Sequence, residues 1–434
     1  MTTSRARRSR PATHPALFRW TREFRLLMTG SYVSMFGSRI TTIACPLLAL
    51  YLTNSAVTAG FVAFAATAPS VLVYIPAGAL VEHWEPRRTL LACESGRGVA
   101  ITVIVVTLAA GELSVSLLVA AVIVEEILEV FSTLAEQRCV RSLVPPDQAS
   151  SAQASIEARA HAVVLAGRPI GAFLFSLTPI LTFLADALTF MVSVSTISRL
   201  KSKRVDSAQE ASAPFTQQLA RLRSDINDGL KWLLHDRYAR VAMTLAAGTT
   251  LVGQALIMVF IAEAHMSGLS PGTMGLVLAA SGGGGVLGSM VASRVPTPPK
   301  ASLILFQMLA WAGAFAILIE SNRPSFLRLA LVMATLSLTG ALGNIEIGTY
   351  LIQNVDENML ARATSIGRLM TFSAYAVGPA LGGVLIQWHG VQNAVLSLFW
   401  ITLALTLLTL CSPSMRYREA FTPATTENPS RVAA

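Results

Sequence analysis

Residues 78–90 read GALVEHWEPRRTL and form a short charged hinge between two long apolar runs. A connection of this length makes the two apolar segments antiparallel neighbours. Gly78 at its start allows their backbones to approach closely, as small residues do in membranes. Glu82 can pair with Arg87 or Arg88 across the hinge. Two interpretations are open: a solvated turn that follows the positive-inside bias, or a gate at the membrane surface whose ion pairs form and break.

The composition indicates a membrane protein. Of the 434 residues, 53% are hydrophobic and only 13% are charged, whereas a soluble domain carries about 25% charged residues. The net charge of +9 does not indicate a nucleic-acid partner, because the basic residues lie in hinges and tails. The four cysteines are far apart in the sequence and show neither metal-ligand spacing nor a disulfide framework. We therefore expect no metal site.

Twelve apolar segments have about the length of 20 residues, or more, that a membrane span requires. The first six lie at 26–52, 57–81, 89–110, 113–135, 155–177 and 180–198. The second six lie at 239–262, 271–293, 301–320, 326–352, 364–387 and 391–411. These segments predict an all-α membrane protein with two six-helix bundles, at 26–198 and 239–411.

Lysine and arginine gather on one side of the predicted membrane. They are frequent in the tail 1–25 and in the linker 199–238, whereas the opposite side collects only Arg323 and Arg328. The positive-inside rule places both termini, including the tail 412–434, in the cytoplasm, so we expect a multi-pass protein of the plasma membrane. Within the linker, apolar residues recur at spacings of three and four, which predicts an amphipathic helix along the membrane surface.

The two halves of the chain resemble each other. Gly78-Ala-Leu-Val is echoed by Gly288-Ser-Met-Val, and Gly167-Arg-Pro-Ile-Gly171 is echoed by Gly378-Pro-Ala-Leu-Gly382. Repeats of half a chain that are joined by a long linker are typical of transporters with two helix bundles.

Four acidic residues lie in one apolar segment, where ionisable groups are expensive and therefore functional candidates. They are Glu125, Glu126, Glu129 and Glu136. Helical geometry places Glu125 and Glu129 within about 40° of one face and Glu126 about 100° away. Buried neighbouring carboxylates can hold protons near neutral pH, so Glu125 and Glu129 are candidates for proton coupling. The alternative is a set of ion pairs with Arg97 or Arg168 that braces the helices.

Other residues within the apolar segments have less distinct patterns. Arg97, Arg168 and Asp186 are candidates for ion pairs. Glu126 and Glu346 are candidates for contacting a substrate, and a bracing hydrogen bond is the alternative for Glu346. Residues 283–288 satisfy GxGxxG formally, but they lie in an apolar segment with no preceding strand, so close helix packing explains them better.

The sequence contains no Walker A motif, HExxH motif, nucleophile elbow or paired-cysteine motif. We therefore expect no catalytic residues, no enzymatic activity and no cofactor.

Several motifs resemble the major facilitator superfamily, and within it the drug/proton antiporter branch that includes macrolide-efflux-like permeases. The hinge 78–88 resembles the superfamily's signature between its second and third helices. The stretches 24–50, 143–148, 184–190 and 357–362 resemble other parts of the branch. The resemblance implies a major-facilitator fold and a cytoplasmic gate at Gly78, Glu82, Arg87 and Arg88. It also implies an antiporter-type helix marked by Gly167, Pro169 and Gly171.

The chain departs from the family's pattern at three places. Glu82 replaces an aspartate and is followed by His83, and Pro86 replaces one arginine of the basic run. The first helix reads Gly37-Ser38 where the family has an acidic residue after the glycine, so no proton-coupling role is expected of that helix.

Taken together, these features predict a secondary active transporter that works by alternating access. We expect a monomer in the lipid bilayer that exports a small hydrophobic or amphiphilic compound, a drug or natural product, in exchange for protons. The direction of export follows from the resemblance alone. A proton-coupled importer and a transport-like membrane sensor without flux remain the alternatives.

Overall fold

The computed structural model describes residues 21–81, 84–144, 156, 163, 166–200, 215–269, 271–292, 302–319, 326–355 and 357–413. All regular secondary structure in these ranges is helical, as predicted. The first group of helices comprises α1 (Arg22–Thr53), α2 (Ala56–Ala65), α3 (Ala68–Val81), α4 (Pro86–Ala109), α5 (Val115–Leu143), a helix over 166–177, and α7 (Pro179–Ser198). The second group comprises α9 (Arg237–Met266), α10 (Pro271–Ala292), α11 (Ser302–Ile319), α12 (Phe326–Asn354) and α13 (Glu357–Cys411). Between the two groups lies α8 (Phe215–His235).

Local sequence explains where several helices begin and end. The Thr21 side chain caps α1 by accepting a hydrogen bond from the backbone N–H of Phe24, and Asn54 ends the helix in the left-handed conformation at φ 51°. The predicted segment 57–81 is two helices, α2 and α3, rather than one. Pro69 has no N–H to donate to the carbonyl of residue 65, so the α-helical pattern is interrupted there.

Two predicted segments are two helices that share the label α13 and follow each other without an intervening loop. Residues 364–387 and 391–411 both fall in α13, which changes direction at Gly390, where φ is 74° and ψ is 173°. Nine helices in the described part of the chain are long and apolar enough to cross a membrane. The 29 residues of α5 would extend about 44 Å, which is also sufficient, although this helix carries the four acidic residues.

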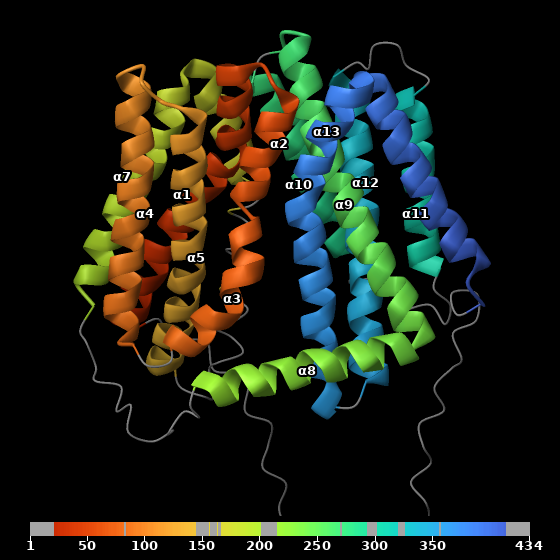
Figure 1. The fold of residues 1–434 in the computed structure, drawn as a ribbon, viewed down its shortest axis with the longest axis horizontal. Coiled ribbons are helices and arrows are strands. Elements are labelled where there is room, and N and C mark those ends of the chain that lie inside the picture. Colours follow the sequence, from red (N-terminus) through yellow and green to blue (C-terminus); the bar gives the residue numbers. More distant parts are fainter. Residues whose placement is uncertain are drawn as a thin grey trace, which may run out of the picture.

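The helices are arranged as two groups that lie side by side (Figure 1). Within the first group α1 packs on α7, and α4 packs on both α5 and α7. Within the second group α9 packs on α13, and α10 packs on α12. Gly284 and Gly288 of α10 contact the backbone of α12 at Ala334 and Leu338, so close packing accounts for the glycine-rich stretch, as predicted. The two predicted bundle boundaries themselves stay a prediction.

The two groups meet at the end of the molecule opposite α8, which lies across the lower end in Figure 1. An added Cβ on Gly60 of α2 would lie 2.6 Å from the carbonyl oxygen of Pro379 in α13. Gly383 of α13 is equally tight against Ala56 at the start of α2. At the same end, His265 Nε2 lies 3.3 Å from Asn54 Oδ1. The structure is therefore closed between the groups on the side away from α8.

Candidate functional site

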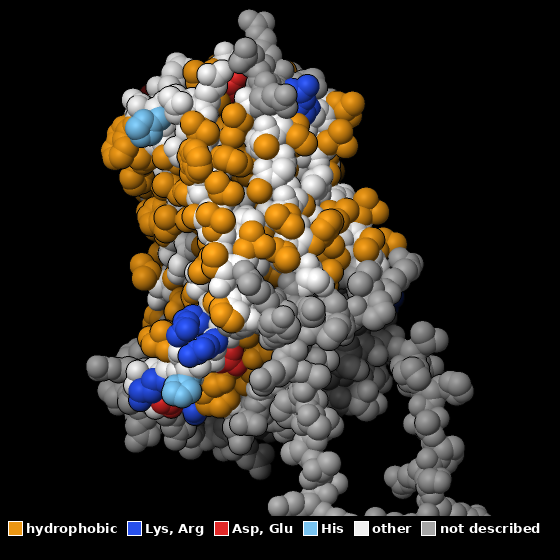
Figure 2. Space-filling model, turned by 90° about the vertical axis from the view of Figure 1, so that its right-hand side faces the viewer, with side chains coloured by type: hydrophobic (Ala, Val, Ile, Leu, Met, Phe, Trp, Pro, Cys, Tyr) orange, Lys and Arg blue, Asp and Glu red, His pale blue; other side chains and the backbone are white. Residues whose placement is uncertain are grey.

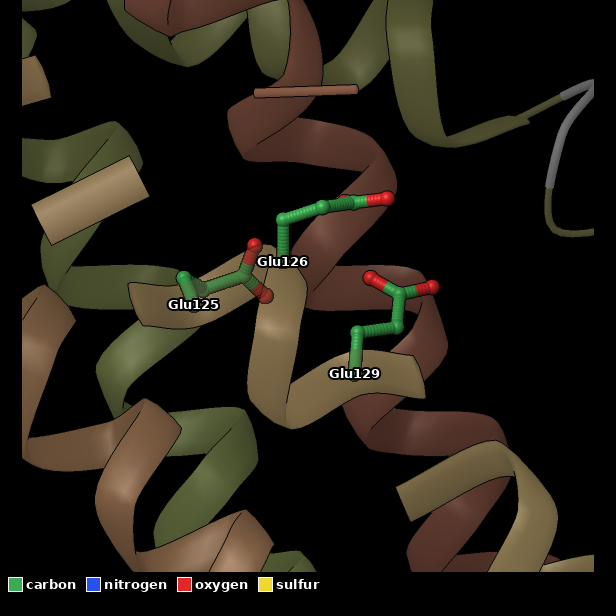
Figure 3. A group of neighbouring side chains, drawn as sticks. All are labelled: Glu125, Glu126 and Glu129. Atoms are coloured by element: carbon green, nitrogen blue, oxygen red, sulfur yellow. The ribbon is translucent and has the colours of Figure 1, made fainter. Parts of the chain in front are cut away.

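The acidic residues of α5 converge on one another. Carboxylate oxygens of Glu125, Glu126 and Glu129 lie within 4.8 Å of one another, and Figure 3 shows Glu125 and Glu126 on one turn of the helix and Glu129 on the next. The helical wheel separates Glu126 from Glu125 by about 100°, but Glu126 and Glu129 are three positions apart and are therefore neighbours on the helix surface. The three carboxylates thus form one cluster, the α5 glutamate cluster.

A single buried guanidinium group neutralises part of this cluster. Arg97 of α4 is 4% exposed. Its Nη2 atom lies 2.7 Å from Glu125 Oε1 and 3.1 Å from Glu129 Oε2. The ring of Phe190 lies under the same group, with the Arg97 Cζ atom 4.8 Å from the ring centre. A guanidinium has five donors in a fixed fork, which suits contact with several carboxylates at once.

Glu94 is a member of this network that the sequence analysis did not select. Its Oε1 atom lies 3.1 Å from Arg97 Nη1, and the side chain is 2% exposed. The hydroxyls of Ser132 and Ser193 each donate to Glu94 at 2.7 Å. An acid in an apolar run, three residues before an arginine, meets the rule that selected the α5 glutamates, so the sequence held the necessary signal.

The first helix joins the network through two consecutive residues. The Ser38 hydroxyl lies 2.7 Å from Arg97 Nη2, and Arg39 Nη2 lies 3.7 Å from Glu129 Oε1. Ser38 is the residue at the position where the family resemblance implies an acid. A neutral hydroxyl there accepts the Arg97 hydrogen bond without adding charge to the network.

The network contains more acids than cations. Among the described residues it brings together Glu94, Glu125, Glu126 and Glu129 with Arg97 and Arg39. Glu126 has no ion pair within 4.0 Å in this part of the chain, whereas Glu94 and Glu125 each have one and Glu129 has two. Excess negative charge inside a membrane is costly, so an acid without a cationic partner here is a functional candidate. The glutamate spacing would also admit a metal ion, but Arg97 already supplies positive charge to two of its members.

Asp186 of α7 is fully buried beside the network and has hydroxyl partners. Its Oδ2 atom accepts a hydrogen bond from Thr41 at 2.5 Å, and Oδ1 accepts one from Thr189 at 3.3 Å. Gly37 lies against the same two α7 residues, and an added Cβ would overlap both side chains. The described partners of Asp186 are therefore neutral groups, whereas the sequence suggested an ion pair.

The helix over 166–177 packs tightly and also reaches the second group. Arg168 Nη2 donates to the hydroxyl of Tyr375 in α13 at 3.1 Å. Gly167 lies against Arg39, and Gly171 lies against the backbone of Ile40, so this helix and α1 approach closely. An added Cβ on Gly275 of α10 would lie 3.1 Å from the Pro169 carbonyl oxygen. These residues of the predicted antiporter-type helix thus form contacts on two sides.

At the charged hinge, the two arginines have different roles. Arg87 Nη2 donates to the Ser198 carbonyl oxygen at 2.6 Å, which satisfies the C-terminal end of α7. Arg88 is paired with Glu85 at 2.5 Å, but its side chain is 85% exposed. Nothing lies within 4 Å of a Cβ added at Gly78. Glu82 and His83 lie outside the described residues, so the predicted pairing of Glu82 stays a prediction.

Glu346 of α12 occupies a closed environment in the second group. It is 0% exposed, its Oε1 atom accepts a hydrogen bond from the Tyr238 hydroxyl at 3.1 Å, and its Oε2 atom accepts one from the backbone N–H of Ile304 at 3.1 Å. The structure thus gives it the bracing contacts that were its alternative role, and no described contact leads from it to the α5 glutamate cluster.

Comparisons with known proteins place the fold in context. A family model described as transmembrane secretion effector matches residues 15–431. No curated protein matches the sequence. The nucleoside transporter NupG superposes with a TM-score of 0.67 at 14% identity, covering 88% of this chain and 97% of that one.

Two further solved structures are similar over nearly their whole length. A bacterial homolog to the human lysosomal transporter Spinster, in an inward-facing and occupied conformation, gives a TM-score of 0.68 at 12% identity and covers 92% of this chain and 98% of that one. A D-xylose–proton symporter gives 0.64 at 12% identity and covers 92% and 99%. The TM-scores and coverages show that these proteins share the fold, and at identities this low they show the fold alone. The predicted fold class is thereby confirmed.

Proposed function

We propose that this chain exports a hydrophobic or amphiphilic compound in exchange for protons. The chain belongs to the transmembrane secretion effector family of the major facilitator superfamily and is therefore a secondary transporter. The observation that carries the proposal is the surplus of carboxylates around Arg97. Glu125 and Glu129 share that one buried cation, and Glu126 lies against them without an ion pair of its own among the described residues.

This arrangement suits a competition between protons and a cationic group. When the α5 glutamate cluster holds a proton, its net negative charge is smaller, and it attracts a positively charged substrate only weakly. When the proton leaves, the uncompensated carboxylate attracts a cation. Glu126, which the sequence suggested for substrate contact, would carry this exchange. Of the two sequence candidates for proton coupling, Glu129 is paired with Arg97 and Arg39, and Glu125, with two hydrogen bonds from Arg97 at 3.0 and 2.7 Å, would anchor the arginine.

Alternating access would require the contact between the two groups to open. The present structure is closed at the end that carries Asn54 and His265 and has α8 at the other end. With both termini in the cytoplasm of a plasma-membrane protein, as the distribution of basic residues suggests, this is a state closed toward the outside. The Gly78 hinge would then act as the gate on the cytoplasmic side, in a chain that works as a monomer.

Transport by reconstituted protein tests the proposal. Proteoliposomes would be loaded with a pH-sensitive dye and exposed to a panel that contains a fluorescent lipophilic cation and an uncharged macrolide. We expect substrate movement to be accompanied by opposite proton movement in the wild type. Glu126→Gln should abolish the proton signal, whereas Glu112→Gln should not, because Glu112 is an exposed acid just before α5.

Other outcomes would decide between the alternatives. Substrate and protons that move in the same direction would establish an importer. Binding of a compound without flux would establish a sensor. Unchanged coupling in Glu126→Gln and in Glu129→Gln would remove the α5 glutamate cluster from the mechanism.

A further inference from the structure

The corner between α8 and α9 is a rigid part of the second group. Leu233 of α8 is 4% exposed, and a Cβ added at Gly229 would lie 2.9 Å from the Ile366 side chain in α13. Asp228 forms an ion pair with Arg362 of α13 at 3.4 Å. The inner face of α8 is therefore fixed to α13 by both apolar and charged contacts.

The turn from α8 into α9 is equally constrained. The Asp236 side chain accepts a hydrogen bond from the backbone N–H of Ala239 at 2.8 Å and one from the Tyr350 hydroxyl at 2.7 Å. Arg240 Nη1 donates to the carbonyl oxygen of Leu234 at 2.8 Å, which satisfies the C-terminal end of α8. The backbone positions from which side chains project at this corner are consequently fixed.

Two of the projecting side chains are positive and have no described acidic partner. Lys231 and Arg237 are exposed, and neither forms an ion pair within 4.0 Å in the described part of the chain. The acids nearest in sequence, Asp228 and Asp236, are already engaged by Arg362 and by the N-terminal turn of α9. Lys231 and Arg237 therefore carry positive charge without an ion-paired acid among the described residues, and Figure 2 shows Lys and Arg side chains near the lower end of the molecule together with Asp or Glu, His and hydrophobic side chains.

Exposed leucines accompany these charges. Leu230 is 44% exposed and Leu234 is 57% exposed. They lie four positions apart on α8 and so share one face, and Lys231 and Leu234 are neighbours at a spacing of three. Since α9 enters its membrane span directly after Arg237, the corner borders the bilayer surface, where apolar side chains meet acyl chains and basic side chains meet headgroups.

We propose that this corner is a binding site for an anionic phospholipid. The headgroup phosphate lies between Lys231 and Arg237, and the upper part of the acyl chains lies on Leu230 and Leu234. Basic groups at a membrane surface favour anionic lipids by about 1 kcal/mol each, or roughly fivefold in affinity. Two such groups on a fixed corner select one headgroup position rather than a diffuse layer of lipid. The site would couple α8, and through it α13, to the composition of the surrounding leaflet.

Lipid retention by the purified full-length chain tests this proposal. The delipidated protein in detergent would be titrated with short-chain phosphatidylglycerol or phosphatidylcholine, and bound lipid would be counted by native mass spectrometry. The variant Lys231→Gln/Arg237→Gln would be compared with Arg141→Gln/Arg199→Gln, which removes two exposed arginines from the first group. We expect the preference of the wild type for phosphatidylglycerol to fall roughly 25-fold in the first variant and to be unchanged in the second.

Each other result overturns the site. An equal loss in both variants would mean that total charge, not the corner, attracts the lipid. No loss in the first variant would remove Lys231 and Arg237 from binding. Equal competition by free glycerol phosphate would assign the corner to a soluble anion. If the first variant does not fold, Leu230→Ser/Leu234→Ser provides a second measurement, in which the affinity for long-chain phosphatidylglycerol should fall while that for glycerol phosphate does not change.

Discussion

The carboxylate of Glu346 accepts a hydrogen bond from the backbone N–H of Ile304 at 3.1 Å, so a side chain of α12 caps the first turn of α11. Backbone N–H groups in that turn have no partner within their own helix. The negative charge also faces the positive end of the α11 dipole. An acid in the middle of an apolar helix can thus serve to complete a neighbouring helix.

Replacement of Glu346 should therefore change stability more than transport. Glu346→Ala leaves a buried N–H without a partner and opens a cavity, and should destabilise the chain by about 2–4 kcal/mol. Glu346→Gln keeps an acceptor oxygen and should cost less. Thermal unfolding of the purified protein in detergent measures both. Equal melting temperatures for wild type and Glu346→Ala would show that the capping contact contributes little.

Loss of Arg97 should be among the most damaging substitutions in the first group. Arg97→Met keeps most of the side-chain volume but leaves three carboxylates without their shared cation, and we expect a cost of about 3–5 kcal/mol. Combining it with Glu125→Gln removes one of the stranded charges and should recover part of the loss. Unfolding curves of the single and double variants test this. A double variant less stable than Arg97→Met alone would contradict it.

The contact between α2 and α13 predicts a conformational effect. Gly383→Val places a branched side chain against the Ala56 backbone and should prevent the two groups from closing at that end. We expect faster labelling by a membrane-impermeant reagent of a cysteine introduced at position 54, in a chain that otherwise lacks cysteine. Gly313→Val is the matched control, since nothing lies within 4 Å of a Cβ added there. Identical labelling rates in the two variants would mean that the interface tolerates the extra volume.

The two hinge arginines should respond differently to the same change. Arg87→Gln loses the hydrogen bond to the Ser198 carbonyl and should destabilise the packing of α4 on α7 by about 1 kcal/mol. Arg88→Gln removes only an exposed ion pair, and such pairs contribute about 0–1 kcal/mol. Thermal unfolding distinguishes the two variants. A larger effect of Arg88→Gln would point to a partner of that residue beyond Glu85.

The positions of the helices could be predicted well because long apolar runs mark the segments that can span a bilayer, and short connections between them make consecutive helices antiparallel. The predicted segment 57–81 was wrong in one respect, since Pro69 interrupts it, and the missing N–H of proline was a visible signal. Hydropathy alone could not show whether the two last predicted segments are joined by a loop or, as in the structure, by a sharp turn at Gly390.

The candidate site was less predictable because its partners come from several helices, although helical spacing already brings Glu126 and Glu125 close to Glu129. Glu126 lies about 100° from Glu125 on an ideal wheel but is three positions from Glu129, a spacing at which side chains are neighbours, and its carboxylate joins both in the structure. The partners of Glu94 come from three helices, and no local pattern connects Ser132 with Ser193. Such contacts follow from tertiary packing, which pairs residues far apart in the sequence.

The break between α2 and α3 divides one membrane pass into two parts with different neighbours. The part before residue 66 packs mainly on α13 and α1, while the part after residue 67 packs mainly on α5 and also contacts α13 and α8. A kink at a proline is a natural pivot. We predict that the lower part bends at this break together with α5, so that access to the α5 glutamate cluster changes by movement of half a helix in addition to the opening of the contact between the groups.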